Sequence, residues 1–506
     1  MRFDLRAKPV TLSREQHAAS VFDRKGGRQA GRSPVTSHRR PAPGGLSSST
    51  TQVGEFNREA LRIEVNNNTS RVTPGLLPPK NCISELQPCP KNTPPVAPAV
   101  TPSVLLAHFR DGCAGTQVAL PFTVPADAAN VGHPRQDRKT TALAGDFMKA
   151  AVLEAFNEPL VIRDVQLSPP GPAEVRVRTS AVSLCHSDLH FMEGTRPLPL
   201  PAILGHEVAG IVEEVGRDVK DLAPGDHVVG ALGVYCGTCP CCLAGRLTLC
   251  SDTSVKQPPG QARRISMEGR HVSQVYNLSA FAEAFVTHRN ALVKITNDIP
   301  LDRAALLGCG VATGTGAVFR TAAVQPGQDV VVIGVGGVGL SAINGARIAG
   351  ANRIIAVDRL PEKLAMATTF GATHGIDASS EDVIARVHEI TGGGADHAIE
   401  CVGVAATLQQ AFGVIKPAGI ATVVGVFPPS LLVPIDANQF LSEKQLRGSM
   451  LGSTRIPVDI PKLAQMYLDG RLLLDQMISR RIRLEEINEG FADMKRGHIA
   501  RCVVIF

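Results

Sequence analysis

Hydrophobic and polar residues alternate in short runs through the middle of the chain. These runs are Met148–Leu153, Leu160–Leu167, Glu174–Ser180, Gly210–Val215 and His227–Gly230. A period of two, broken by Gly and Pro, is typical of strands with one buried face. Short and evenly spaced strands of this kind predict a partly open antiparallel β-barrel.

Further along, the apolar residues form continuous runs instead of alternating ones. Asp329–Gly334 and Arg353–Val357 flank a helix-like stretch at Leu340–Ala349, and Asp396–Cys401 and Ile420–Val426 repeat the scheme. Continuous Val/Ile runs indicate strands that are buried on both faces. The alternation with helices predicts an α/β fold with a doubly wound parallel sheet.

The change of pattern gives a domain division. We expect a catalytic domain at 148–310 and a nucleotide-binding domain at 311–450. The last stretch, 451–506, turns strand-like again and is expected to return to the first domain. At 506 residues the chain is long enough for two or three domains.

Residues 1–147 have a different composition. They contain 16 of the 36 Pro and show no sustained hydrophobic period, so we expect a disordered extension. They also carry 19 Lys and Arg against 11 Asp and Glu, a net charge of +8 within a total of +6. The extension is interpreted either as an over-long gene start or as a targeting or tethering tail, although its early acidic residues count against a transit peptide.

The remaining composition excludes some function classes. Because the basic excess belongs to the extension, it is no argument for nucleic-acid or membrane binding by the main body. No apolar run approaches the length of about 18 residues that a membrane span needs. Five of the twelve Cys are clustered within residues 236–250, which favours metal binding over disulfides and a reducing, cytoplasmic location.

Metal-ligating residue types are concentrated between Cys185 and Glu207. The stretch contains Cys185-His-Ser-Asp-Leu-His190 and Gly205-His-Glu207. Zinc prefers Cys and His ligands, and neighbouring carboxylates orient such ligands. We therefore expect Cys185 and His206 to hold a catalytic zinc. Cys309, in the sequence Gly308-Cys-Gly310, is a candidate third ligand, although a lone Cys in an apolar segment is more often simply buried.

A second group of cysteines has the spacing of a structural zinc site. Separations of 3, 3 and 8 residues select Cys236, Cys239, Cys242 and Cys250 and leave Cys241 over. Four thiolates complete a tetrahedral zinc shell with no open position.

A glycine-rich loop connects the first continuous apolar run to a helix. It reads Gly334-Val-Gly336-Gly337-Val338-Gly339, and Asp358 ends the next predicted strand. This is the dinucleotide-binding pattern in its proper strand, loop and helix context. Asp358 would accept from a ribose hydroxyl and repel a 2′-phosphate, which favours NAD over NADP. Arg359 and Lys363 weaken that preference, since both can meet a phosphate.

Together these motifs resemble the zinc-dependent, medium-chain alcohol dehydrogenases from Met148 to Phe506. The resemblance implies a GroES-like catalytic barrel, a Rossmann domain and two Zn²⁺ per subunit. It implies that Cys185, His206 and Cys309 bind the catalytic zinc and that Asp188 and Glu207 orient its ligands. Ser187 and His190 match a proton relay. Cofactor contacts are implied for His186, Gly334, Gly336, Gly337, Val338, Gly339, Asp358, Lys363 and Arg501.

The resemblance also bears on substrate and assembly. The long segment Ser251–Leu278 is similar to that of the dimeric members, so a homodimer is expected. The implied substrate pocket contains Thr313, Val426, Met450 and Leu249, which suits a primary alcohol with an aromatic or long apolar group. The alternatives are a thiol-adduct (S-hydroxymethyl) formaldehyde dehydrogenase and, more remotely, a non-enzymatic structural or binding relative. Gly194–Pro201 lacks the acidic residues that glutathione-dependent members carry, which counts against a glutathione-linked substrate.

Overall fold

The computed structural model describes residues 146–256, 264–497 and 499–506. The expected disordered extension lies outside the described residues except for Asp146 and Phe147. These two pair with Leu167 and Gln166 and begin the first strand, two residues before the predicted start. Both side chains are exposed, so hydrophobic alternation gives no sign of this main-chain pairing. Among the described residues, none of the helices combines the length and hydropathy that a bilayer-spanning segment requires.

The first half of the described chain forms two sheets that make a nearly closed barrel. One has the order β8-β7-β2-β1-β4-β9. The other has the order β11-β6-β5-β3-β19-β18 with β10 paired to β3, and it includes β18 Ile478–Ile482 and β19 Arg501–Ile505 from the C-terminal stretch. The strands are β1 Asp146–Leu153, β2 Val161–Leu167, β3 Glu174–Ser183, β4 Ala202–Ile203, β5 Glu207–Val215, β6 His227–Gly230, β7 Ile265–Met267, β8 Arg270–His271, β9 Ser273–Gln274, β10 Ala284–His288 and β11 Leu292–Lys294. The short helical elements of this half are α1 His186–Met192, α2 Pro240–Leu243, η1 Leu247–Leu249, η2 Arg289–Ala291, α3 Leu301–Ala304 and η3 Ala305–Gly308.

The barrel strands form where alternate residues can be buried. Along β3, buried Val175, Val177 and Thr179 alternate with more exposed neighbours. The side chains of Val175 and Val177 join a core with Leu167, Phe281 and Phe285. The loops between the strands carry the Cys and His motifs, so the barrel acts as a rigid support for them.

The C-terminal stretch returns to this half, as β18 Ile478–Ile482 and β19 Arg501–Ile505 join the sheet of β3. The expectation that 451–506 is strand-like is nevertheless wrong for much of its length. It contains η6 Leu451–Ser453, α9 Ile456–Leu468, η7 Asp475–Met477, η8 Leu484–Glu486 and α10 Ile487–Arg496. Helix α9 buries Ile456, Ile460, Leu463 and Ala464, a helical spacing that Pro457 and Pro461 obscure in the sequence.

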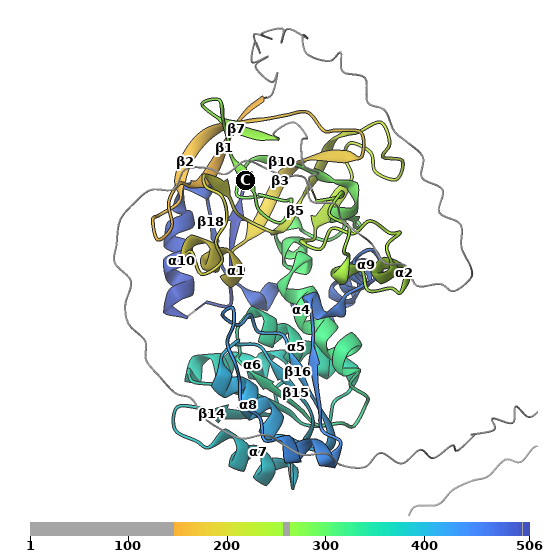
Figure 1. Cartoon of the computed structure of the whole chain (residues 1–506), viewed down its shortest axis with the longest axis vertical. Helices are drawn as coiled ribbons and strands as arrows, with labels where there is room; N and C mark the ends of the chain where they lie inside the picture. The colour runs from red at the N-terminus through yellow and green to blue at the C-terminus, as the bar shows by residue number, and fades with distance from the viewer. Residues whose placement is uncertain (1–145, 257–263, 498) are drawn as a thin grey trace, which may run out of the picture. The chain divides into compact units, whose positions relative to one another are not determined.

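The second half is a six-stranded parallel sheet with the order β14-β13-β12-β15-β16-β17. In chain order this is 3-2-1-4-5-6, the order of a Rossmann fold. Figure 1 shows α5, α6, α7 and α8 around β15 and β16. The elements are α4 Gly310–Gly316, η4 Ala317–Ala322, β12 Val330–Ile333, α5 Gly337–Ala349, β13 Ile354–Asp358, α6 Pro361–Phe370, β14 His374–Asp377, α7 Val383–Thr391, β15 Ala395–Glu400, α8 Ala405–Gly413, β16 Ile415–Val423, η5 Ala437–Ser442 and β17 Gln445–Gly448.

Strand β12 shows why continuous apolar runs form this sheet. Val330 and Val332 face one core with Leu340 of α5, whereas Val331 and Ile333 face another core with Phe412 of α8. Both faces of the strand are therefore buried, and no polar alternation is tolerated.

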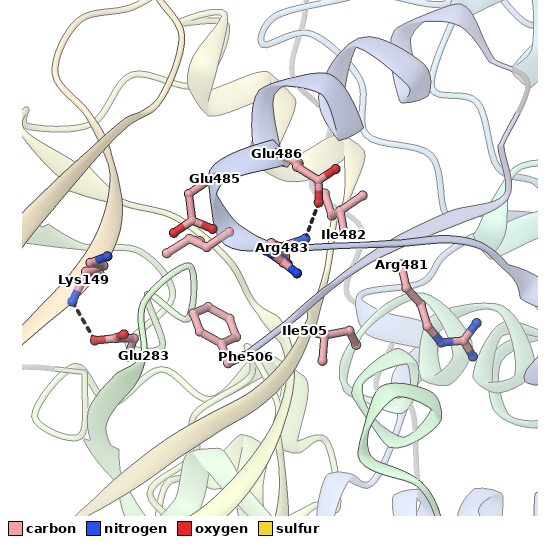
Figure 2. A pocket seen from close by; sticks show the side chains of 10 residues that line it. Lys149, Glu283, Arg481, Ile482, Arg483, Glu485, Glu486, Ile505 and Phe506 are labelled. Carbon is pink, nitrogen blue, oxygen red and sulfur yellow. Dashed lines mark hydrogen bonds between the residues drawn. The ribbon is translucent and has the colours of Figure 1, made fainter.

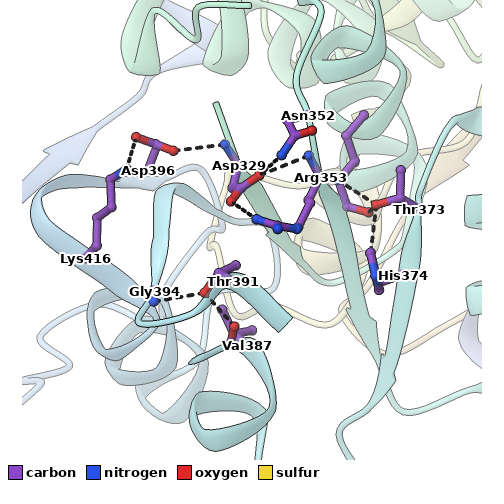
Figure 3. Close-up of polar contacts among 11 residues, drawn as sticks. Asp329, Asn352, Arg353, Thr373, His374, Val387, Thr391, Gly394, Asp396 and Lys416 are labelled. Carbon is purple, nitrogen blue, oxygen red and sulfur yellow. Dashed lines mark hydrogen bonds and ion pairs between the residues drawn. The ribbon is translucent and has the colours of Figure 1, made fainter. Parts of the chain in front are cut away.

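Polar groups close the sheet at the end where the strands begin (Figure 3). Asp329 accepts from the side chain of Asn352 at 3.0 Å and pairs with Arg353 at 2.8 Å. Its own N–H donates to Asp396, which also pairs with Lys416. These bonds satisfy strand ends that lack ladder partners and leave the opposite end, where the strands finish, for the glycine-rich loop.

Candidate active site

Four buried side chains meet where the barrel loops approach α4. Cys185 precedes α1, His206 directly precedes β5, Glu207 begins β5, and Cys309 lies between η3 and α4. One potential ligand atom from each lies within 4.8 Å of those of the others. The two Cys are more than a hundred positions apart in the sequence, and the structure brings them together.

His206 is oriented by the carboxylate of Asp188. Its Nδ1 lies 3.0 Å from Asp188 Oδ1, which also accepts from the Gly205 N–H at 3.1 Å. Gly205 has φ +92°, and a Cβ there would lie 2.7 Å from the backbone nitrogen of Phe281, so no other residue fits without movement. His206 Nε2 is buried and has no hydrogen-bond partner among the described residues. A buried imidazole nitrogen without a partner is costly unless it binds a cation.

The pKa values of the two thiols in the cluster, Cys185 and Cys309, are shifted in opposite directions. The hydrogen bond with Cys309 lowers the pKa of Cys185 well below its usual range. The same contact, with burial, raises the pKa of Cys309. A bound cation would stabilise both thiolates, because metal ligation requires deprotonated sulfur. Two thiols, an imidazole oriented through its other nitrogen and full burial therefore fit a zinc ion.

Glu207 links this cluster to Arg501. Its Oε1 accepts from the Gly310 N–H at 2.9 Å and lies 3.4 Å from an Arg501 guanidinium nitrogen. Burial raises the pKa of Glu207 to about 7, although Arg501 opposes that shift. Arg501 is 4% exposed, and a Cβ on Gly337 would lie 2.2 Å from its Cζ. The guanidinium thus lies against the first residue of α5.

The glycine-rich loop is shaped to hold an anion at the start of α5. Gly334 has φ +91°, and a Cβ on Gly339 would lie 1.9 Å from the Gly334 carbonyl oxygen. A Cβ on Gly336 would meet nothing within 4 Å, so open space adjoins the N-terminus of α5. Half-buried Val338 follows in the first turn of α5. Free backbone N–H groups at a helix N-terminus beside an arginine fit a pyrophosphate.

Asp358 ends β13 and is bound to the same loop. One carboxylate oxygen accepts from the Val335 N–H at 2.8 Å, and the other accepts from Arg359 and Leu360 N–H groups. Lys363 Nζ lies 4.0 Å away. Asp358 therefore shapes the loop in addition to the ribose contact that the sequence predicts.

The predicted relay residues lie on α1. His186 is exposed, whereas Ser187 and His190 are half-buried. His190 Nδ1 lies 3.4 Å from Thr195 Oγ1. The helix places Ser187 and His190 three residues apart on one face, next to Cys185.

The predicted pocket residues are not gathered into one buried pocket. Thr313 is 8% exposed in α4, whereas Leu249, Val426 and Met450 are about half exposed at 48%, 47% and 58%. Leu249 ends η1, and Met450 precedes η6, which lies beside η1.

Four further cysteines, Cys236, Cys239, Cys242 and Cys250, form a compact group around α2. Cys236 Sγ lies 4.0 Å from Cys242 Sγ, and Cys239 Sγ lies 3.9 Å from Cys250 Sγ. Disulfide sulfurs would be about 2.05 Å apart, whereas tetrahedral Zn–S bonds of about 2.3 Å separate the sulfurs by about 3.8 Å. Backbone N–H groups of Cys236 and Cys239 also point at cluster sulfurs. The group fits a structural zinc, and Cys241 is not part of it.

Two side chains that the sequence analysis passed over lie beside His206. The Tyr276 ring packs edge-on to the His206 ring, with centroids 5.2 Å apart. Arg196 donates to the Tyr276 hydroxyl at 2.8 Å. No motif or periodic signal in the sequence marks Arg196, which lies within Gly194–Pro201, or Tyr276.

A surface hollow lies elsewhere in the barrel half (Figure 2). It measures about 560 Å³ and is lined by Lys149 of β1, Arg481 of β18 and the C-terminal Phe506, among others. It shares no residue with either Cys group, so we do not assign the active site to it.

Comparisons with known proteins agree with these observations. The family model described as "Alcohol dehydrogenase GroES-like domain" matches residues 171–297, and "Zinc-binding dehydrogenase" matches residues 337–468. "Alcohol dehydrogenase 1" of Pisum sativum is 36% identical over 365 residues, which cover 70% of this chain and 96% of that protein. "Alcohol dehydrogenase-like 7" of Arabidopsis thaliana is 37% identical over 368 residues, 70% of this chain and 94% of that protein.

Solved structures give the same result. An alcohol dehydrogenase zinc-binding domain protein from Burkholderia ambifaria has a TM-score of 0.69 and 37% identity, covering 71% of this chain and 99% of its own. Benzyl alcohol dehydrogenase from Acinetobacter calcoaceticus has a TM-score of 0.67 and 34% identity over the same shares of the two chains.

Proposed function

The chain belongs to the zinc-dependent medium-chain alcohol dehydrogenase family, and from that premise we propose that it oxidises a primary alcohol to an aldehyde with NAD as hydride acceptor. It is an oxidoreductase of a family that uses zinc and NAD(P). The observation that carries the proposal is the buried cluster of Cys185, His206 and Cys309, in which His206 Nε2 has no other partner among the described residues.

The proposed roles follow from the positions of the side chains. Zinc at this cluster would act as a Lewis acid that lowers the pKa of the alcohol hydroxyl. Ser187, two residues after Cys185, would accept the hydroxyl proton, and half-buried His190 would pass it to solvent. Asp188 orients His206, while Glu207 and the Gly310 N–H keep the buried Arg501 beside α5. A second zinc is proposed for Cys236, Cys239, Cys242 and Cys250, where it would stabilise the loop around α2.

NAD is the proposed cofactor because Asp358 places a carboxylate at the end of β13. A negative charge there opposes a 2′-phosphate, and the nearby Lys363 only partly offsets it. Asp358→Ala should therefore lower the ratio of kcat/KM for NAD to that for NADP at least tenfold. An unchanged ratio would remove this basis for NAD.

A homodimer is proposed from the edge of the parallel sheet. Strand β17 ends the sheet order, and its four residues are exposed. The preceding segment exposes Leu432 and Leu441 by 88% and 85%. An open strand edge beside exposed apolar side chains is a surface that proteins cover. Light scattering should show a dimer, and Leu441→Glu should shift it toward monomer; a monomeric wild type would contradict the proposal.

A cytoplasmic location is proposed from the cysteines. All nine cysteines among the described residues are free, and six of them belong to the two proposed zinc sites. Thiolate ligands persist best in a reducing compartment. The thiol-adduct alternative is not favoured, because the relatives described above carry the names of alcohol dehydrogenases.

The test is an assay of NADH absorbance with purified full-length chain, NAD and benzyl alcohol. Wild type should form NADH, Cys185→Ala should lose activity at least a thousandfold, and Cys241→Ala should keep it. Full activity of Cys185→Ala, or no oxidation of any primary alcohol tried, would overturn the proposal.

A further inference from the structure

Arg196 is a half-buried cation close to the proposed zinc ligands. Among the residues that the structure describes, no carboxylate forms an ion pair with it; the nearest acidic residue along the chain, Glu193, pairs with Lys495 at 2.9 Å. The backbone N–H of Arg196 donates to the His190 carbonyl at 3.2 Å. This bond ties the residue to the end of α1. Positive charge held near an active site without a paired acid favours an anionic ligand.

Aromatic side chains hold the guanidinium in a fixed position. Its Cζ lies 5.3 Å from the Phe191 ring centroid and 6.0 Å from that of Tyr276. The two rings contact each other edge-on at 5.5 Å, and the Tyr276 hydroxyl accepts from one guanidinium nitrogen. Stacking and one hydrogen bond leave the other guanidinium N–H groups available.

The backbone that presents Tyr276 is itself constrained. Tyr276 and Asn277 have φ of +52° and +57°, a region that non-glycine residues seldom adopt and that is enriched at functional sites. Ser279 secures the turn, since its hydroxyl donates to the Ile203 carbonyl at 2.8 Å and accepts from the Val275 N–H at 2.9 Å. The turn therefore holds the Tyr276 ring against His206.

The His206 imidazole and the Arg196 guanidinium lie at opposite ends of the Tyr276 side chain. The ring of Tyr276 contacts the His206 imidazole, and its hydroxyl contacts Arg196. A substrate that lies along the Tyr276 side chain with its alcohol at His206 would place a para substituent near Arg196.

We propose that Arg196, fixed by Tyr276 and Phe191, binds a carboxylate at the far end of the alcohol substrate. The substrate class is then a primary alcohol with a carboxylate about one aromatic ring away from the hydroxymethyl group. This inference rests on the proposed function and sharpens its apolar or aromatic substrate: the body of the substrate stays apolar, and its end is anionic.

The test compares 4-(hydroxymethyl)benzoate with 4-methylbenzyl alcohol, which has a neutral group at the same position. Wild type should oxidise the carboxylate with a kcat/KM at least equal to that of the neutral alcohol. Arg196→Gln should lower kcat/KM for the carboxylate about 10–100-fold, mainly through KM, because a hydrogen bond to a charged group contributes about 1.5–3 kcal/mol. The neutral alcohol should change less than about threefold.

Further variants separate recognition from a purely structural role. Arg196→Lys keeps the charge but loses the fork and the stacking, so it should recover part of the preference for the carboxylate. Tyr276→Phe keeps the ring against His206 but frees Arg196, and should lower the preference about 2–10-fold. Arg217→Gln, which removes one exposed positive charge from the same domain, should leave it unchanged.

The outcomes distinguish this inference from the proposed function. If the two alcohols lose activity equally in Arg196→Gln, or the wild type rejects the carboxylate, Arg196 is only a structural brace and the inference fails while alcohol oxidation stands. If no alcohol reduces NAD, both fail.

Discussion

The hydrogen bonds of Asp188 allow a quantitative prediction for zinc affinity. Asp188 Oδ1 is 3.0 Å from His206 Nδ1 and 3.1 Å from the Gly205 nitrogen, and both Asp188 and His206 are fully buried. Asp188→Asn keeps the shape of the side chain and removes its charge. A hydrogen bond to a charged group contributes about 1.5–3 kcal/mol and a neutral one about 0.5–1.5 kcal/mol, so roughly 1–2 kcal/mol is lost from the support of His206.

At about 1.4 kcal/mol for each factor of ten, that loss corresponds to roughly a 5–30-fold weaker affinity at one zinc site, which overlaps the range of about 10–100-fold seen when residues behind metal ligands are changed. Competition with a chromogenic chelator measures the affinity. We expect the tighter binding at the four-Cys site to stay unchanged and only the other zinc to be released more readily. Asp396→Asn, which alters a carboxylate at the far end of the parallel sheet (Figure 3), is the control. Equal affinity in Asp188→Asn and wild type would refute the claim that Asp188 orients a zinc ligand.

Two further predictions use matched pairs of variants. Cys242→Ala should lose one zinc per chain and lower the melting temperature by roughly 5 °C or more, because a structural metal contributes directly to folding; Cys241→Ala should do neither, and equal effects would contradict the selection of Cys242. Gly337→Ala should raise the KM for NAD about tenfold or more, since its Cβ would lie 2.2 Å from the Arg501 Cζ, whereas Gly448→Ala, whose Cβ meets nothing within 4 Å, should keep the KM of wild type.

The fold class follows from the sequence because its signals are local. Alternation along β3 and continuous apolar runs in β12 and β13 are each set by the faces that those strands bury. Helix α9 was not predicted because Pro461 interrupts its sequence pattern. Its buried apolar residues lie on one face only once the segment is helical. The start of β1 could not be predicted from the hydrophobic pattern, because Phe147 is exposed and its main chain pairs with β2 whatever its side chain.

Some residues of the candidate site have a local sequence signal, and others are brought together only by the fold. The spacing of Cys236, Cys239, Cys242 and Cys250 is local, so the sequence singles out the residues that the structure brings together. Cys309 alone has no such signal, and its place beside Cys185 depends on how α4 meets the barrel. The contact of Arg196 with Tyr276, 80 residues later, depends on a turn with positive φ. Neither contact can be derived from residue types alone.

The measurement that tests the central claim most directly is the zinc content of Cys309→Ala together with its activity. Wild type should contain two zinc ions per chain, one for each group of ligands. Cys309→Ala should contain one, lose NADH formation from benzyl alcohol, and keep a cooperative thermal transition, because the four-Cys site remains intact. Two zinc ions and undiminished activity in Cys309→Ala would contradict a catalytic zinc held by Cys185, His206 and Cys309.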